Sequence, residues 1–203
     1  MSQLPFSQAC ENNKQPILSH LESVFSQSKQ VLEIGSGTGQ HCVFFAENLP
    51  HLTWQASDQN AYLPHLNQRI EMEGSENLLP AFGLDVTLTW PSNLISDKLD
   101  GLYTANTLHI MSKSMVEYFF DGLGQYLHLN SNVAIYGPFN YQGQYSSESN
   151  ASFDIWLKQN NPDSGIRDIE WILKLASDQG LSLQDDIEMP ANNRLLHFIR
   201  TQV

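Results

Sequence analysis

The chain has 203 residues, of which 41% are hydrophobic and 16% are charged. This length and composition predict one globular domain with a substantial hydrophobic core. Acidic residues outnumber basic ones by 22 to 10, which gives a net charge of −12. Because an acidic chain repels phosphate groups, we expect neither a nucleic acid nor a membrane as partner. The two cysteines form no disulfide framework and no metal-binding pattern, so no metal is expected.

The sequence also bears on location. No apolar run approaches the ~20 residues that a membrane-spanning helix needs. The first residues lack the charged and then apolar pattern of a signal peptide. We therefore expect a cytoplasmic protein.

The chain begins with a polar segment, residues 1–15, which Pro16 follows. Proline is favoured at the first position of a helix, so Pro16 is expected to open one. The apolar residues that follow lie on one helical face. Residues 1–30 are thus expected to form an N-terminal cap segment and a helix.

The next stretch, residues 31–41, has the strongest pattern in the chain. Residues 31–34 predict a short buried parallel strand, and a helical pattern begins at Gln40. Between them stand three glycines: Gly35, Gly37 and Gly39. Glycine lets a ligand approach the backbone, and the following helix directs free amides and its positive dipole end toward that ligand. This pattern predicts a loop that binds a nucleotide cofactor.

The residue pattern of the loop distinguishes between classes of nucleotide cofactor. A phosphate-binding P-loop ends in Gly-Lys-Ser/Thr, but here Gln40 and His41 follow the last glycine. A dinucleotide loop reads G-x-G-x-x-G, whereas this one reads G-x-G-x-G. With Glu33 two residues ahead of the first glycine, the loop resembles the first motif of class I S-adenosylmethionine-dependent methyltransferases. A glycine-rich turn without a ligand remains the alternative at this point.

Two further strand ends carry carboxylates. Residues 52–57 predict a second strand that ends at Asp58, 23 positions after Gly35. A doubly wound sheet places such a carboxylate beside the cofactor ribose, at about 20 residues' distance, and its two oxygens can accept from two hydroxyls. Together with the glycine loop, the ribose role is favoured over a plain turn residue. Asp85 follows a third strand, and we weigh equally a role at the adenine, with Val86 or Trp90 beside the ring, and a turn.

The fourth predicted strand, residues 99–104, is followed by Asn106 and His109. Ligands of open α/β sheets bind at the carboxyl ends of the strands. These two residues are therefore expected where substrate and transferred group meet, with His109 as general base. A histidine hydrogen-bonded in the wall is the alternative reading. The Asn/Asp-Pro-Pro-Tyr signature of nucleobase methyltransferases is absent, which further disfavours nucleic acid.

The remaining elements complete the predicted fold. A helix at 115–127 and a strand at 133–136 lead to a long polar segment, and residues 138–165 are expected to form a lid or substrate insertion. A helix from Asp168 to Gly180 precedes a sixth strand, into which residues 181–183 lead, and a seventh strand at 195–199. Residues 189–193 join the two strands, and so short a connection demands an antiparallel pair. The predicted fold is α/β and doubly wound, with seven strands in the order 3-2-1-4-5-7-6, the last strand antiparallel and helices on both faces. NAD-binding domains do not usually end in this way.

Several stretches are similar to the family of methyltransferase-like protein 26. The matching stretches are residues 9–17, 31–41, 136–139, 149–150 with 153–154, 165–168 and 189–193. The chain departs from the family pattern at Asn12, where arginine is usual, and after Ile110, where a Pro-Trp pair is common. The resemblance implies a Rossmann-like class I methyltransferase fold that binds S-adenosyl-L-methionine, and it supplies no substrate.

These observations together predict a methyltransferase that acts on a small-molecule acceptor. The alternative is a non-catalytic cofactor-binding or regulatory protein, and an NAD-dependent oxidoreductase is disfavoured. The expected cofactor ligands are Glu33, Gly35, Gly37, Gly39, Asp58, Asp85 and Asn106. The expected catalytic residues are His109 and Asn106. The expected substrate-side residues are Asn13, Tyr136, Phe139, Asn140, Asn150 and Asp154. Arg167 with Asp168 is a further candidate for the site, but a structural ion pair between them at a helix start explains this pair equally well.

Overall fold

The computed structural model describes residues 4–91 and 99–202 of the chain. Its centre is a seven-stranded sheet with the strand order β3-β2-β1-β4-β5-β9-β8. The strands are β1 Gln30–Ile34, β2 Thr53–Asp58, β3 Leu78–Gly83, β4 Gly101–Ala105, β5 Asn132–Gly137, β8 Leu181–Met189 and β9 Asn193–Arg200. The strands β1 to β5 of this sheet run parallel, and β9 is antiparallel to both β5 and β8. The predicted fold class and strand order are confirmed.

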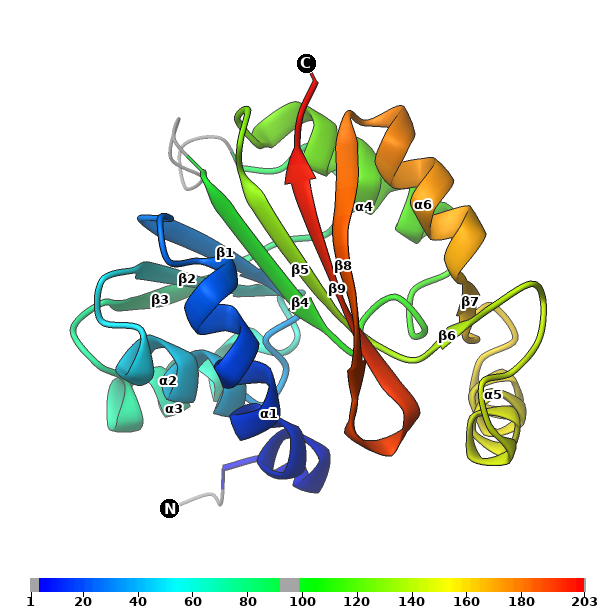
Figure 1. Cartoon of the computed structure of the whole chain (residues 1–203). Helices are drawn as coiled ribbons and strands as arrows, with labels where there is room; N and C mark the ends of the chain where they lie inside the picture. Colours follow the sequence, from blue (N-terminus) through cyan, green and yellow to red (C-terminus); the bar gives the residue numbers. More distant parts are fainter. Residues whose placement is uncertain (1–3, 92–98, 203) are drawn as a thin grey trace.

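Helices cover both faces of the sheet (Figure 1). They are α1 Gln8–Val24, α2 Gln40–Asn48, α3 Leu63–Glu73, α4 Lys113–Tyr126, α5 Glu148–Asn160 and α6 Ile169–Asp178. Successive residues of β1 point to opposite faces, as strand geometry requires. Val31 belongs to a buried cluster with α1, α2 and α3. Leu32 and Ile34 belong to the other buried cluster, with α4 and α6.

The start of α1 differs from the prediction. The helix begins at Gln8, and Pro16 lies inside it rather than at its first position. Ser7 caps the helix, and its hydroxyl oxygen accepts from the Cys10 amide at 3.3 Å. Contacts with α2 and α3, described below, hold the two turns ahead of the proline. The residues expected as a polar cap segment are therefore largely helical.

The segment between β5 and β8 forms a small unit of its own. A two-stranded sheet pairs β6 Phe139–Asn140 with β7 Arg167–Asp168, and α5 lies between them in the chain. The sequence did not predict this pairing. In Figure 1, α5, the start of α1 and the turn between β8 and β9 lie at one end of the sheet. That turn contains the 3-10 helix η1 Pro190–Asn192.

In the described ranges, no helix combines the length and the apolar character needed to cross a bilayer.

Candidate cofactor and acceptor site

The glycine loop is held by the end of β2. The amides of Gly35 and Ser36 both donate to the Ser57 carbonyl oxygen at 3.0 Å. The Gly37 amide donates to Oδ2 of Asp58 at 2.7 Å. The three glycines have φ values of 77°, 55° and 79°, in the left-handed region that favours glycine. The loop conformation therefore depends on glycine and on the residue that the sequence assigns to the ribose.

The three glycines face different surroundings. A Cβ at Gly35 would lie 2.4 Å from Cγ2 of Thr107, and one at Gly39 would lie 2.9 Å from Cδ1 of Leu66. A Cβ at Gly37 would meet nothing within 4 Å. Gly35 and Gly39 thus allow close packing within the protein, whereas Gly37 opens onto a cavity. Gly39 also precedes α2 as its N-cap and lines neither of the two cavities described next.

Two adjoining cavities lie over the loop, with volumes of about 540 and 430 Å³. Both are lined by Gly35, Gly37, Asn106, Thr107 and Ile110. The smaller cavity also contains Asp58 and the apolar side chains of Leu84, Val86 and Met115. The larger cavity also contains Glu33, His109, Asn13 and Tyr136. Predicted cofactor and substrate residues therefore line two cavities that share part of their walls.

Asp58 lines the smaller cavity with its carboxylate. Besides the Gly37 contact, Oδ1 accepts from the Gln59 amide at 2.7 Å. Burial raises the pKa of Asp58, and these backbone hydrogen bonds oppose the rise. A carboxylate has about four lone-pair sites, so two acceptor sites remain for a ligand.

Asp85 is exposed and lines a neighbouring hollow rather than either of these two cavities. Its Oδ1 accepts from the amide and the hydroxyl of Thr87, at 2.9 and 2.7 Å. Val86 reaches the smaller cavity, whereas Trp90 is buried against Tyr126, with ring centroids 5.2 Å apart. Of the two side chains expected beside the adenine, only Val86 lies where a ring could contact it.

Glu33 is a buried acid on an apolar sheet face. Its side chain is 2% exposed, and Oε2 accepts from the indole N–H of Trp54 at 2.8 Å. Burial raises the pKa of Glu33 to about 7, while hydrogen bonds from Trp54 and Ser36 oppose the rise. The strand thus keeps an acid where an apolar residue would be more stable.

This raised pKa predicts how the stability of the ligand-free protein depends on pH. Between pH 4.5 and 7 the folded state keeps a proton on Glu33 that the unfolded state has already released. Raising the pH therefore favours unfolding in this window, by up to about 3 kcal/mol, and adds nothing above it. We expect Glu33→Gln to lack this loss, because the amide cannot ionise.

Urea denaturation of the parent and of Glu33→Gln at pH 5, 6.5 and 8 measures this difference. Other titrating groups act in both proteins, so they cancel when the two free energies of unfolding are subtracted. Parallel pH profiles for the two proteins would contradict the placement of an ionisable Glu33 in the core.

Asn106 and His109 lie where the sequence placed them, at the carboxyl end of β4. Asn106 has a φ of 58°, and its amide donates to the Tyr136 carbonyl oxygen at 2.8 Å. A Cβ at Gly137 would lie 3.7 Å from Nδ1 of His109 and 4.0 Å from Oδ1 of Asn106. His109 is 5% exposed, and burial together with the charge of Arg167 lowers its pKa to about 4. Its imidazole is therefore neutral at pH 7 and can accept a hydrogen bond, but burial and the charge of Arg167 disfavour its protonation.

The loop that carries His109 is held by the segment before α6. The Gly165 amide donates to the His109 carbonyl oxygen at 2.9 Å. The guanidinium of Arg167, which is 6% exposed, donates to the carbonyl oxygens of Leu108, Met111 and Asp163. The ion pair considered for Arg167 is not among its contacts with the described residues. Arg167 instead fixes the backbone on both sides of His109.

The other predicted substrate-side residues are placed unevenly. Phe139 is buried in the core on the α4 and α6 face. Asn140 lines a different cavity, beside Arg167. Asn150 donates to Ser146 and to the Asn192 carbonyl oxygen. Asp154 accepts from Tyr145, Lys158 and the Ile166 amide. These four line neither of the two cavities over the glycine loop. Phe153 lines the larger one and meets His109 edge-on, with ring centroids 5.3 Å apart.

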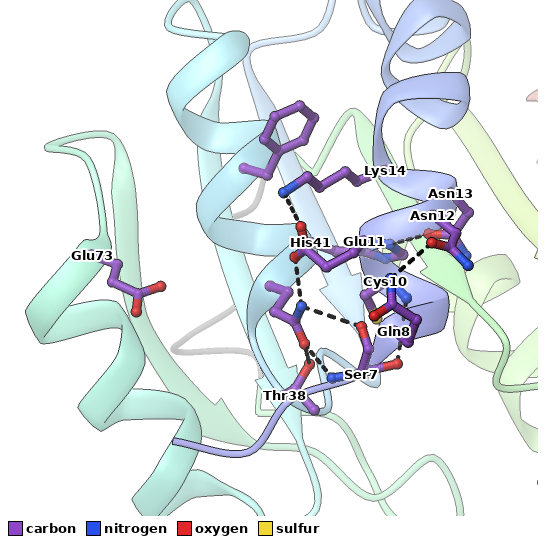
Figure 2. Close-up of polar contacts among 12 residues, drawn as sticks. Ser7, Gln8, Cys10, Glu11, Asn12, Asn13, Lys14, Thr38, His41 and Glu73 are labelled. Carbon is purple, nitrogen blue, oxygen red and sulfur yellow. Dashed lines mark hydrogen bonds and ion pairs between the residues drawn. The ribbon is translucent and has the colours of Figure 1, made fainter. Parts of the chain in front are cut away.

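The start of α1 covers the glycine loop through a polar network that the sequence did not predict (Figure 2). Gln40 accepts from the Ser7 amide at 2.6 Å, and its amide group donates to Glu11 at 2.6 Å. Glu11 also pairs with Lys14 at 2.5 Å. From α3, Arg69 donates to the carbonyl oxygens of Thr38 and Pro5, at 2.7 Å each. Because the contacts of Gln40 and Arg69 join segments far apart in the chain, spacing alone gave no signal for them.

Comparison with known proteins agrees with this architecture. A family model described as "Protein of unknown function (DUF938)" matches residues 4–200. An O-methyltransferase family protein from Burkholderia thailandensis superposes with a TM-score of 0.78 at 15% identity, over 96% of this chain and 58% of that one. Human N-acetylserotonin methyltransferase, solved with S-adenosylmethionine, gives 0.77 at 13%, over 96% and 53%. PigF, solved with S-adenosylhomocysteine, gives 0.77 at 14%, over 93% and 56%. The chain thus spans about half the length of these neighbours, and the likeness shows a Rossmann-like methyltransferase fold.

Proposed function

The chain belongs to the DUF938 family of proteins of unknown function, and we propose that it is an S-adenosylmethionine-dependent methyltransferase acting on a small-molecule acceptor. One observation carries this proposal. The glycine loop opens at Gly37 onto two adjoining cavities, of which one contains Asp58 and the other His109. The solved neighbours that bind S-adenosylmethionine or its product support the choice of cofactor. Fold alone does not establish activity, so the site carries the argument.

The residues present fit this cofactor. Gly37 leaves its backbone open, and Asp58 has two acceptor sites free for ribose hydroxyls. Gly35 and Gly39 shape the loop, Asn106 lines both cavities, and Glu33 lies beneath the loop as an acceptor for an ammonium group. We assign Asp85 to the adenine amino group through Oδ2, which makes none of its contacts with Thr87. Asp85 lines the neighbouring hollow, which shares Gln59 and Leu84 with the smaller cavity, so this assignment requires the adenine to reach across that shared wall. When bound, the cofactor supplies a methyl group activated by a sulfonium.

The acceptor side is suited to an uncharged small molecule. We keep His109 as the candidate base: its neutral imidazole can accept a hydrogen bond from an acceptor hydroxyl or amine, and Asn106 lies beside it. To take the proton as well, the ring needs its pKa raised when the acceptor binds, because burial and Arg167 lower it. Phe153 supplies an aromatic wall. The net charge of −12 disfavours a nucleic-acid substrate, because phosphate groups are repelled. We propose a cytoplasmic location for the reaction. The resemblance to methyltransferase-like protein 26 forms part of this proposal and names no acceptor.

Calorimetric titration with S-adenosylmethionine, S-adenosylhomocysteine and NAD tests the proposal. We expect binding of both sulfur nucleotides and none of NAD. Binding of NAD in their place would indicate an oxidoreductase, and no binding of any of the three would contradict the cofactor site. A screen of small hydroxyl and amine acceptors then separates an enzyme from a binding or regulatory protein, because only the enzyme forms S-adenosylhomocysteine.

A further inference from the structure

We propose that Asn13 and Tyr136 bind the carboxylate of the cofactor's aminocarboxypropyl chain, and that His41 fixes the orientation of Asn13. This inference rests on the proposed function, because it takes the same cofactor as ligand. It assigns to the cofactor two residues that the sequence placed on the substrate side. It also gives a positioning role to His41, which the sequence did not single out.

The cofactor needs such a site because its aminocarboxypropyl chain ends in charged groups. The aminocarboxypropyl chain carries an ammonium, which needs acceptors, and a carboxylate, which needs donors or a cation. In the part of the chain that the structure describes, no lysine or arginine lines the larger cavity. Glu33 is the acid in its lining. The carboxylate must therefore be met by neutral donors, because an unpaired buried charge is costly.

Suitable donors lie on the same sheet face as Glu33. The strand register pairs Glu33 with Tyr103, and Ala105 with Tyr136. Because side chains alternate along a strand, Glu33, Tyr103 and Tyr136 all point toward α1 and α2. Asn13 reaches the same cavity from α1 and is 6% exposed. One acid and two neutral polar groups thus share one part of the cavity.

His41 determines which end of the Asn13 amide faces the cavity. Its Nε2 lies 2.7 Å from Oδ1 of Asn13, and its Nδ1 lies 3.3 Å from the Tyr103 hydroxyl (Figure 2 shows Asn13 and His41). Burial lowers the pKa of His41 to about 4, so the ring is neutral and carries one N–H. The Tyr103 hydroxyl can donate to Nδ1, whereas Oδ1 of Asn13 can only accept. Nε2 therefore donates to Oδ1 and leaves the Asn13 N–H groups free to act as donors elsewhere.

The Tyr136 hydroxyl is the second proposed donor. Side-chain hydrogen bonds from Asn13 and Asn193 lower the pKa of Tyr136, but burial raises it more, so the phenol stays neutral. A neutral phenol has one O–H, which can donate to a ligand in the larger cavity that Tyr136 lines. The second N–H of Asn13 is available in the same way. Asn13 and Tyr136, which both line the larger cavity, can thus each offer a donor to a carboxylate.

Two nucleosides distinguish binding of the cofactor's carboxylate from an acceptor-side or a general structural role of Asn13 and Tyr136. S-adenosylhomocysteine has the aminocarboxypropyl chain, whereas 5′-methylthioadenosine lacks it and keeps the adenosine and the thioether. We expect Tyr136→Phe to weaken S-adenosylhomocysteine binding by roughly tenfold or more, the usual effect of losing a charge-assisted hydrogen bond. Binding of methylthioadenosine should change less than about twofold. Asn13→Asp replaces a donor with an anionic oxygen and should show the same selectivity with a larger loss.

Matched variants control for folding and test the positioning role. Tyr118→Phe removes an exposed hydroxyl from α4 and should leave both affinities unchanged. His41→Gln keeps an N–H that can donate to Asn13 and should retain most of the preference for S-adenosylhomocysteine. His41→Leu removes that donor and should lose the preference while methylthioadenosine still binds.

The outcomes separate this inference from the proposed function. Unchanged S-adenosylhomocysteine affinity in both Tyr136→Phe and Asn13→Asp would overturn the inference and return these residues to the acceptor side. An equal loss for both nucleosides would also overturn it, since the effect would then be general. A parent protein that prefers methylthioadenosine would contradict the inference alone, whereas one that binds neither nucleoside would contradict the proposed function as well.

Discussion

Replacement of Asp58 by alanine is expected to weaken S-adenosylhomocysteine binding by about a hundredfold or more while the protein stays folded. The two acceptor sites that Asp58 keeps free would each lose a ribose hydroxyl, and hydrogen bonds to charged groups contribute about 1.5–3 kcal/mol each. The Gly37 amide would also lose its partner at 2.7 Å, so the loop that faces the cofactor would be less well held. Calorimetry measures the affinity, and circular dichroism checks the fold.

Asp58→Asn sharpens this prediction, because it separates binding from stability. Burial raises the pKa of Asp58, so the ionised carboxylate is less favourable in the folded state than in the unfolded state. Stability is therefore reduced above that pKa, and the neutral amide removes this cost. The amide has only one oxygen, however, so it can accept from the Gly37 or the Gln59 N–H but not from both. At pH 8 we therefore expect Asp58→Asn to unfold near the parent's temperature and to bind poorly. Such trade-offs between stability and binding are common at functional sites.

Parent-like affinity in either Asp58 variant would show that this carboxylate does not contact the ribose. A collapse of the unfolding temperature in Asp58→Asn would instead assign the residue to the scaffold. Asp121→Asn, on α4 outside the lining of the cavities over the loop, is a matched control and should leave binding unchanged.

The sheet could be predicted because its signals are local. Short apolar strands end in glycine or polar residues, and the missing helix between the last two strands requires an antiparallel pair. The start of α1 could not be predicted in this way. Pro16 is favourable at a first helical position, but the turns before it are held by Gln40 and Arg69, from segments that the sequence does not place nearby.

In the candidate site too, residues with a local sequence signal could be placed, and residues that depend on distant contacts could not. The residues that end parallel strands, Asp58, Asn106 and His109, line the cavities, because the carboxyl ends of parallel strands meet at one edge. No comparable rule of sheet geometry places the residues of the insertion between β5 and β8. Asp154 looked available for a substrate, yet three donors of the protein take its oxygens. Periodicity shows that a residue is polar and does not show which partner it meets.

Substitution of single glycines in the loop should separate packing from ligand contact. Gly35→Ala forces a left-handed φ of 77° on alanine and places Cβ 2.4 Å from Thr107. The backbone cost of about 1–2 kcal/mol and an overpacking cost of about 1–3 kcal/mol together predict a loss of roughly 2–5 kcal/mol in the free energy of unfolding. For a chain of this length, such a loss lowers the unfolding temperature by several degrees or more.

Gly37→Ala carries a similar backbone cost but no clash, because its Cβ meets nothing within 4 Å. We expect a loss of only about 1–2 kcal/mol in stability, together with loss of S-adenosylhomocysteine binding, since the new methyl group lies in the wall of both cavities. Denaturation and calorimetry on the two variants test the contrast directly. If Gly37→Ala bound the nucleotide as the parent does, the loop would not approach the cofactor at this residue, and its glycine would serve the turn alone.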